Sequence, residues 1–202
     1  TIKLEWNQSL LTAHGGSFIL SNSVIESNNT GEGILCHNID YPLIENNIFN
    51  NVPDAVEFIQ CTHGRILNNK ISNNIEDAID LNGCSQILVS GNTIFNVQDC
   101  GVEIDCTRYS VSSEIDISKN TILKVNYGVM LLNNSEAAIV DNQIIKVHHA
   151  ICVSDDDKKT NIKKHPDELK NDISNGFEIN FMLLISIAFL SFFSFYFFLS
   201  TT

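Results

Sequence analysis

The strongest constraint on this chain is a repeat with a period of about two dozen residues. An asparagine followed two positions later by an apolar residue recurs at intervals of 22 to 28 residues. The recurring asparagines are Asn22, Asn46, Asn69, Asn92, Asn120 and Asn142. The apolar residues that follow them are Val24, Ile48, Ile71, Ile94, Ile122 and Ile144. A period of this length is typical of a solenoid, in which each repeat stacks on the next.

A second motif predicts that each repeat is built from β-strands. A small residue followed by Ile or Val recurs in every repeat, with another apolar residue two positions further on. These pairs begin at Gly33, Ala55, Ala78, Gly101, Gly128 and Ala150. A spacing of two favours short strands over helices. We therefore expect an all-β solenoid of about six coils of 22–28 residues.

The two motifs together resemble the right-handed parallel β-helix of the pectin lyase-like superfamily over residues 18–153. The resemblance implies a structural role for the asparagines, which would stack, hydrogen-bond one another and accept the left-handed backbone of a tight turn. Residues 1–17 are expected to form a partial N-terminal coil, since the segment from Ile2 to Glu5 already alternates like a strand.

Acidic residues are predicted to gather on one face of the solenoid. Alignment on the small-apolar pair places Glu57, Asp80 and Glu103 at one outward position on successive coils, about 5 Å apart. Repulsion is expected to raise the pKa of Asp80, the middle carboxyl. Such a trio could hold Ca²⁺ or supply an acid and a base for glycoside chemistry. The alternative is a solvated acidic face, because outward strand positions are usually polar.

The coil between Asn92 and Asn120 is 28 residues long and carries about five extra residues near positions 107–114. Such an insertion predicts either a loop on a binding face or a surface loop that is merely tolerated. Arg108 lies in it and is the expected counter-charge to the acidic face. Similarity to polysaccharide lyases would give Ca²⁺ and a basic residue the main roles, although arginine is a poor base.

Two further positions resemble the polygalacturonase branch of the same superfamily. The sequence Asp77-Ala78-Ile79-Asp80, followed one coil later by Asp99-Cys100, is similar to that branch's catalytic aspartates. The resemblance implies catalytic roles for Asp77 and Asp99, beside Asp80, Glu103 and Arg108. The branch's downstream Gly-His-Gly and Arg-Ile-Lys motifs are absent.

The six cysteines contain no CxxC pair and therefore no zinc or redox motif. Cys61 and Cys84 occupy equivalent positions on adjacent coils, so their Cα atoms should lie about 5 Å apart, which is within disulfide range. We expect a Cys61–Cys84 disulfide in an oxidising compartment.

The last quarter of the chain differs in composition. Residues 154–180 are charged and poor in large apolar residues, which predicts a disordered linker. Residues 181–202 carry no charged side chain and are long enough to cross a bilayer as a helix. The segment is expected to be a transmembrane helix or the signal for a glycosylphosphatidylinositol anchor.

These features together predict a membrane-tethered protein at the cell surface that binds carbohydrate or has a structural or adhesive role. The alternative is a polysaccharide lyase or glycoside hydrolase acting on acidic polysaccharide. Ca²⁺ is the cofactor expected, with the membrane and polysaccharide as partners. A net charge of −12 argues against nucleic acid, which requires a basic surface.

Overall fold

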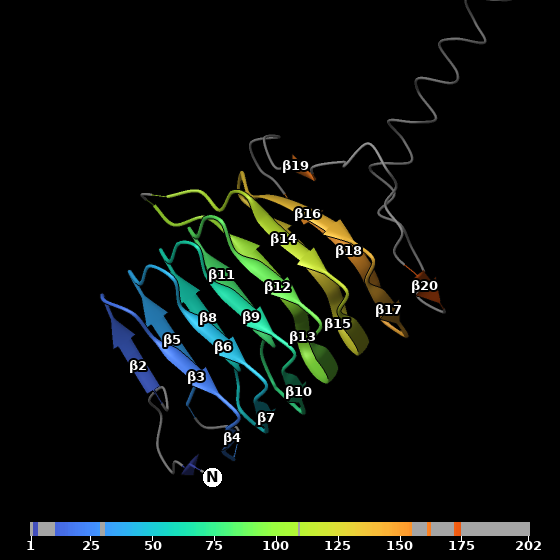
Figure 1. Ribbon diagram of the computed structural model, residues 1–202. Coiled ribbons are helices and arrows are strands. Elements are labelled where there is room, and N and C mark those ends of the chain that lie inside the picture. Colours follow the sequence, from blue (N-terminus) through green and yellow to red (C-terminus); the bar gives the residue numbers. More distant parts are fainter. Residues whose placement is uncertain are drawn as a thin grey trace, which may run out of the picture.

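The computed structural model describes residues 2–3, 11–28, 31–108, 110–154, 161–162 and 172–174. They form a parallel β-solenoid of about six turns (Figure 1). Each coil contributes strands to three parallel stacks, which we call face 1, face 2 and face 3 in the order in which the chain from Leu11 onward meets them.

Face 1 contains β2 (Leu11–His14), β5 (Ile34–His37), β8 (Val56–Ile59), β11 (Ile79–Asn82), the second halves of β13 (Thr93–Asp105) and β15 (Thr121–Leu132), and β18 (His149–Ser154). Face 2 contains β3 (Ile19–Ser21), β6 (Leu43–Glu45), β9 (Arg65–Leu67), β12 (Leu88–Ser90), β14 (Ile115–Ser118), β16 (Glu136–Val140) and β19 (Asn161–Ile162). Face 3 contains β1 (Ile2–Lys3), β4 (Val24–Glu26), β7 (Ile48–Asn50), β10 (Lys70–Ser72), the first halves of β13 and β15, β17 (Gln143–Ile145) and β20 (Asp172–Ser174). Strands β13 and β15 are long because each bends from face 3 into face 1 without a break.

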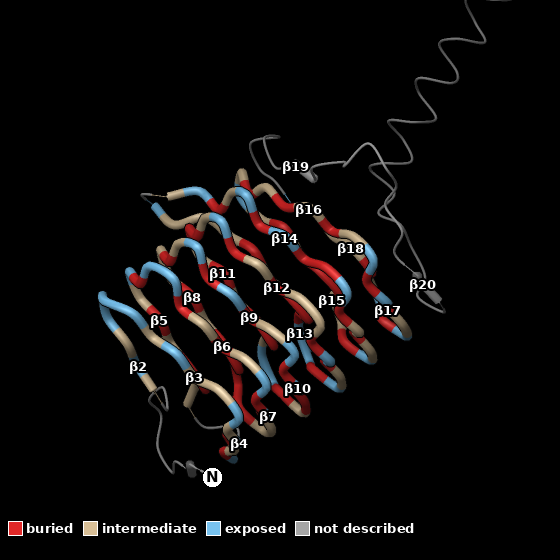
Figure 2. Tube along the Cα trace, viewed as in Figure 1, coloured by how far each residue is buried: buried red, intermediate tan, exposed pale blue. Residues whose placement is uncertain are grey.

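The core is made of rows of apolar side chains that point into the coil. Figure 2 shows buried and exposed residues alternating along the coils. The inward row of face 3 is Ile25, Phe49, Ile71, Ile94, Ile122 and Ile144, all fully buried. Burial of one such side chain contributes about 1.5–3 kcal/mol. The rows extend the core along the whole solenoid, because each coil adds one residue to each row.

The small-apolar motif is confirmed. The pairing of Ile34 with Val56, and of Val56 with Ile79, aligns the predicted positions on face 1. The small residue precedes the strand where the chain enters face 1. At Gly128 a Cβ atom would collide with the carbonyl oxygen of Ala150 on the next coil. A larger side chain would therefore push these two coils apart.

In the first two coils, the apolar residue two positions after the repeat asparagine is not the inward residue; the next residue is. Val24 and Ile48 are 36% and 43% exposed, whereas Ile25 and Phe49 are fully buried. Phe49 pairs with Ile71, which was assigned correctly. Since strand side chains alternate between faces, an error of one residue exchanges inside for outside.

The predicted ladder of hydrogen-bonded asparagines is present, but its first member is displaced by one residue. Its members are Asn47, Asn69, Asn92, Asn120 and Asn142, each 1% exposed. In each adjacent pair the side-chain nitrogen of one asparagine donates to Oδ1 of the next at 3.0–3.1 Å, and the backbone nitrogen donates to the same oxygen at 2.9 Å. The ladder therefore begins at Asn47 and not at Asn46, and Ser23 replaces Asn22 at the equivalent position, where its backbone nitrogen donates to Asn47.

The left-handed backbone conformation belongs to the residue before each ladder position. These residues are Asn22, Asn46, Asn68, Gly91, Lys119 and Asp141, with φ between 53° and 69°. The turn conformation and the buried hydrogen bonds, both expected at one residue, belong to two neighbouring residues, because the turn residue faces outward and the ladder residue inward.

The stacking continues into the segment predicted to be a linker. Strand β19 pairs with β16, and β20 pairs with β17, with Ile173 aligned with Ile144. Residues 181–202, the predicted membrane segment, lie outside the described residues. Within the part of the chain that is described, no helix has the length and apolarity needed to span a bilayer.

Candidate functional site: a carboxylate band on face 1

The outer surface of face 1 carries two adjacent rows of acidic residues. The row on the strands is Glu57, Asp80 and Glu103, and strand pairing aligns Asp80 with both of the others, as predicted. The row before the small residues contains Glu32, Asp54 and Asp77 and continues to Cys100. We call the six carboxylates of these rows, Glu32, Asp54, Glu57, Asp77, Asp80 and Glu103, the carboxylate band.

Backbone hydrogen bonds fix one row of the band. The backbone nitrogen of Asp77 donates to Oδ1 of Asp54 at 2.7 Å, and that of Cys100 donates to Oδ1 of Asp77 at 2.7 Å. Asp54 and Asp77 are thus each held by the coil that follows.

Burial makes these carboxyls unusually weak acids. It raises the pKa of Asp54, Glu57 and Asp77 to about 7 each, with further increases from neighbouring carboxylates. The pKa of Asp80 rises to about 8, first because the group is desolvated and second because Glu103 and Glu57 repel its charge. The increase predicted for Asp80 is confirmed, but desolvation and not repulsion is its main cause.

Asp80 has an unsatisfied oxygen. Its Oδ2 accepts a hydrogen bond of 2.7 Å from Nδ2 of Asn82. Its Oδ1 is buried and has no hydrogen-bond partner in the described part of the chain. A buried polar atom without a partner costs about 1–3 kcal/mol, so a proton or a bound cation would stabilise this position.

The side chains form two clusters across the rows instead of one cluster along a row. Glu32, Asp54 and Glu57 each offer an oxygen, and these atoms lie within 4.8 Å of one another. The second cluster offers two oxygens and a sulfur within the same distance of one another, and it consists of Asp77, Cys100 and Glu103. The trio predicted for Ca²⁺ is not one of these clusters: Glu57 and Glu103 are two coils apart, about 10 Å at the usual strand spacing. Two ligands of one Ca²⁺ lie at most about 5 Å apart.

The first cluster is the better match for Ca²⁺. Calcium binds oxygen ligands at about 2.3–2.6 Å in flexible geometry, which three carboxylates can supply. The second cluster contains the fully buried thiol of Cys100, whose Sγ lies 3.5 Å from Oε2 of Glu103. Thiol sulfur is a soft ligand and does not suit calcium.

Two of the predicted catalytic residues are not members of the band, although the carboxylate of Asp99 lies close enough to raise the pKa of Asp77 and Glu103. Asp99 is exposed and precedes Cys100, so Cys100 and not Asp99 follows Asp77 in the row. Arg108 is exposed in the inserted loop. The charges that most strongly shift the pKa values of the band are other carboxylates.

The insertion lies where the sequence placed it, between β13 and β14. The backbone nitrogen of Thr107 donates to the carbonyl of Ser110 at 2.7 Å, and Oγ of Ser112 donates to the carbonyl of Asp105 at 2.6 Å. The loop packs over Gly83, where a Cβ atom would come within 2.8 Å of Thr107. Hydrogen bonds between residues of the loop therefore close it where the chain leaves face 1.

The predicted Cys61–Cys84 disulfide is absent, since both thiols are free and fully buried. Cys61 donates to the carbonyl of Cys36, and Cys84 donates to the carbonyl of Phe58. The two thiols are also hydrogen-bonded to each other, so the side chains are in contact without a covalent bond.

Thiol labelling should distinguish buried from accessible cysteines. Cys106 and Cys152 are partly exposed, whereas Cys36, Cys61, Cys84 and Cys100 are buried. We expect native protein to react with a maleimide at Cys106 and Cys152 alone, and unfolded protein to react at all six positions. Mass spectrometry of labelled peptides would check this. Resistance of Cys61 and Cys84 to labelling after unfolding without reductant would instead indicate a disulfide.

Sequence reasoning missed Glu32 and Cys100 as members of the site. Glu32 precedes Gly33 just as Asp54 precedes Ala55, so extension of the alignment by one coil would have found it. Cys100 follows from the same offset before Gly101. No pattern in the sequence indicates that the two rows lie close together, because their separation depends on how the chain turns at the small residue.

Comparison with known proteins gives one match. The model of a family described as a right-handed β-helix region matches residues 8–165. No curated protein and no solved structure matches the chain.

Proposed function

Because the chain belongs to the right-handed β-helix family, we propose that its solenoid is a cell-surface domain that binds Ca²⁺ on the carboxylate band and, through it, acidic polysaccharide. Residues 181–202 would tether the domain to a membrane, since they carry no charged side chain. The finer placement in the pectin lyase-like superfamily rests on the motifs of the sequence.

The cluster of Glu32, Asp54 and Glu57 is the observation that carries the proposal. Three carboxylates with oxygens within 4.8 Å of one another repel in the absence of a cation. The unpartnered Oδ1 of Asp80 lies in the adjacent position of the band. A bound Ca²⁺ would remove the repulsion and leave coordination positions for the carboxylates of a uronate chain.

Calorimetric titration of the full chain with Ca²⁺ tests the proposal. We expect binding at pH 8 that weakens at pH 6, because the band must lose protons before it can bind a cation. Glu57→Gln should lower the affinity at least tenfold, since it removes one of three anionic ligands. Asp116→Asn, an exposed carboxylate of β14 on face 2, is the matched control and should leave it unchanged. No heat from the wild-type protein at pH 8 would refute the site.

A glycoside hydrolase or lyase is the second candidate, favoured by the distance between Asp77 and Glu103. Their carboxylate oxygens lie within 4.8 Å, and retaining glycosidases place two carboxyls about 5–5.5 Å apart. If this function holds, the chain should release reducing ends from oligogalacturonate. Asp77→Asn should then lower kcat by at least a hundredfold, while Asp116→Asn on face 2 should have little effect.

A further inference from the structure

Both rows of the carboxylate band are continued by a sulfur-containing residue. The row before the small residues passes from Asp77 to Cys100, whose backbone nitrogen donates to Oδ1 of Asp77 at 2.7 Å. The row on the strands passes from Glu103 to Met130, which are paired between β13 and β15. Sγ of Cys100 lies 3.8 Å from Sδ of Met130. Two carboxylates and two sulfurs therefore meet where the band ends.

The contacts of these side chains converge on the thiol. Sγ of Cys100 lies 3.5 Å from Oε2 of Glu103, and the thiol is also hydrogen-bonded to the side chain of Asp77. Cys100 is fully buried, whereas Asp77, Glu103 and Met130 are half-buried. Oδ1 of Asp99 lies 3.8 Å from the same sulfur and adds negative charge beside it. The sulfur is thus covered by groups that can themselves bind a cation.

The distances between these atoms suit a tetrahedral ion. Zn²⁺ binds sulfur at about 2.3 Å and carboxylate oxygen at about 2.0–2.2 Å. In tetrahedral geometry, two sulfur ligands then lie about 3.8 Å apart, and a sulfur and an oxygen about 3.6 Å apart. The protein has 3.8 Å between the two sulfurs and 3.5 Å between Cys100 and Glu103. The ligand atoms of Asp77, Cys100 and Glu103 lie within 4.8 Å of one another, which places Asp77 within reach of the same ion.

We propose a site for a thiophilic divalent cation, best matched by Zn²⁺, whose ligands are Asp77, Cys100, Glu103 and Met130. Thiolate and thioether sulfur favour such an ion over Ca²⁺, which takes six to eight oxygen ligands. Four protein ligands leave no position open for water, which is typical of structural zinc sites. The ion would stabilise the solenoid, and it would block Asp77 and Glu103, the pair on which the hydrolase candidate depends.

A neighbouring carboxyl also points to a cation at this position. The buried Oδ1 of Asp80 has no hydrogen-bond partner in the described part of the chain. Asp80 is paired with Glu103 on the adjacent coil, and Glu103 contributes more than Glu57 to the rise in the pKa of Asp80. A cation bound by Glu103 would offset this repulsion.

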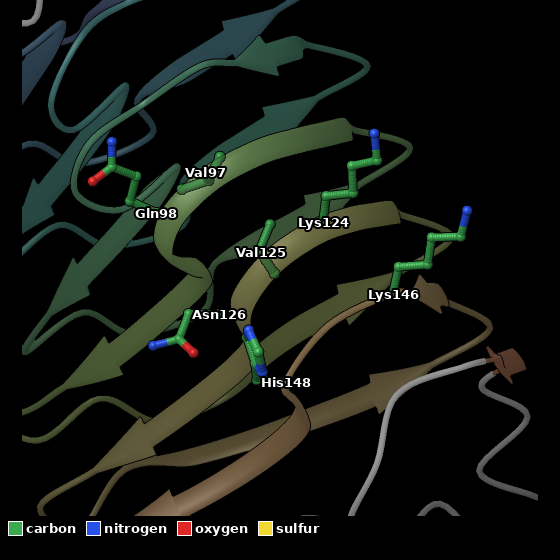
Figure 3. A pocket seen from close by; sticks show the side chains of 7 residues that line it. All are labelled: Val97, Gln98, Lys124, Val125, Asn126, Lys146 and His148. Atoms are coloured by element: carbon green, nitrogen blue, oxygen red, sulfur yellow. The ribbon is translucent and has the colours of Figure 1, made fainter.

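The pocket where face 3 bends into face 1 is not a competing site for the ion (Figure 3). It has a volume of about 330 Å³ and offers one common metal ligand, His148. No carboxylate or thiol lines this pocket, whereas Lys124 and Lys146 do. Two ammonium groups would repel a cation.

Calorimetric titration of the full chain with Zn²⁺ tests the proposal, in excess Ca²⁺ so that any calcium site is already occupied. We expect tight binding of a single ion. Cys100→Ser should lower the Zn²⁺ affinity at least a hundredfold, since a hydroxyl replaces the thiolate ligand. The matched control is Cys106→Ser with Cys152→Ser, which removes the two partly exposed thiols and should leave the affinity unchanged. No tight binding by the wild type, equal affinity in Cys100→Ser, or loss of binding in the control would overturn the proposal.

Two conservative variants keep the test decisive if Cys100→Ser does not fold. Glu103→Gln should lower the affinity about tenfold, because it removes an anionic ligand. Met130→Leu, which conserves volume, should lower it about threefold. An unchanged affinity in both variants would refute the site.

Titration with Co²⁺ in place of Zn²⁺ reports the ligands directly. Tetrahedral Co²⁺ bound to a thiolate has strong visible bands and a charge-transfer band in the near ultraviolet, and we expect both in the wild type. A weak octahedral spectrum would contradict the site. Glu57→Gln should leave Zn²⁺ binding unchanged although it weakens Ca²⁺ binding, so failure of one proposal is distinguishable from failure of the other.

Discussion

Replacement of Asn92 with leucine is expected to destabilise the solenoid by about 3–5 kcal/mol. Asn92 lies in the middle of the ladder and is 1% exposed. Its Nδ2 donates to Oδ1 of Asn120 at 3.0 Å and to the carbonyl of Ile66 at 2.9 Å. Its Oδ1 accepts from both the backbone and the side-chain nitrogen of Asn69 at 2.9 and 3.0 Å.

The cost is large because the partners stay buried after the substitution. A single lost hydrogen bond contributes about 1 kcal/mol, but each donor or acceptor left unsatisfied costs about 1–3 kcal/mol. Leucine supplies none of these bonds and is of similar size, so water does not gain access to replace them. The amide groups of the ladder also polarise one another, which makes loss of a central member more costly than loss of an end.

Urea denaturation followed by circular dichroism would measure this change. Thr93→Leu is the control, because Thr93 is adjacent in sequence but exposed. The control should change the free energy of unfolding by less than about 0.5 kcal/mol. A loss below about 1 kcal/mol in Asn92→Leu would show that the ladder contributes little to stability.

The solenoid should be more stable at pH 5 than at pH 8.5 by several kcal/mol. Unfolded carboxyls have pKa values of about 3.9–4.3, whereas Asp54, Glu57 and Asp77 have pKa values of about 7 and Asp80 of about 8 in the folded protein. The folded state therefore binds more protons between these values. Its stability is highest near pH 4 to 5 and decreases as the pH rises through 7 to 8.

One pKa unit corresponds to about 1.4 kcal/mol, so Asp80 alone accounts for a change of a few kcal/mol. The shifts of the band are not additive, because each carboxyl that stays protonated relieves its neighbours. A few kcal/mol correspond to a decrease in Tm of about 10 °C for a domain of this size.

Thermal unfolding at several pH values would test the direction of this dependence. Asp80→Asn should flatten the profile and stabilise the protein at pH 8.5 by about 2–3 kcal/mol, since asparagine cannot ionise. Asp116→Asn should follow the wild-type profile, because Asp116 is exposed. Stability that rises steadily from pH 5 to pH 8.5 would contradict the burial of charge in the band. Added Ca²⁺ should raise Tm at pH 8.5 and not at pH 5 if the proposed site is occupied.

Much of the architecture could be predicted from the period of the sequence. Each coil adds one residue to every row, so residues at equivalent repeat positions must be neighbours. This reasoning found the small-apolar rows and the alignment of Glu57, Asp80 and Glu103. It failed in the first two coils, where two polar residues in succession, such as Asn46 and Asn47, fit the ladder equally well by sequence.

What the sequence determined by itself is the stacking order, because strand pairing at a fixed spacing turns a sequence period into a spatial row. What only the tertiary structure decided is how one row meets the next. The turn before Val56 brings Asp54 beside Glu57. Cys61 and Cys84 are free thiols, although the repeat places them on adjacent coils. These relations depend on backbone angles at the corners and on side-chain direction, which the repeat period does not specify.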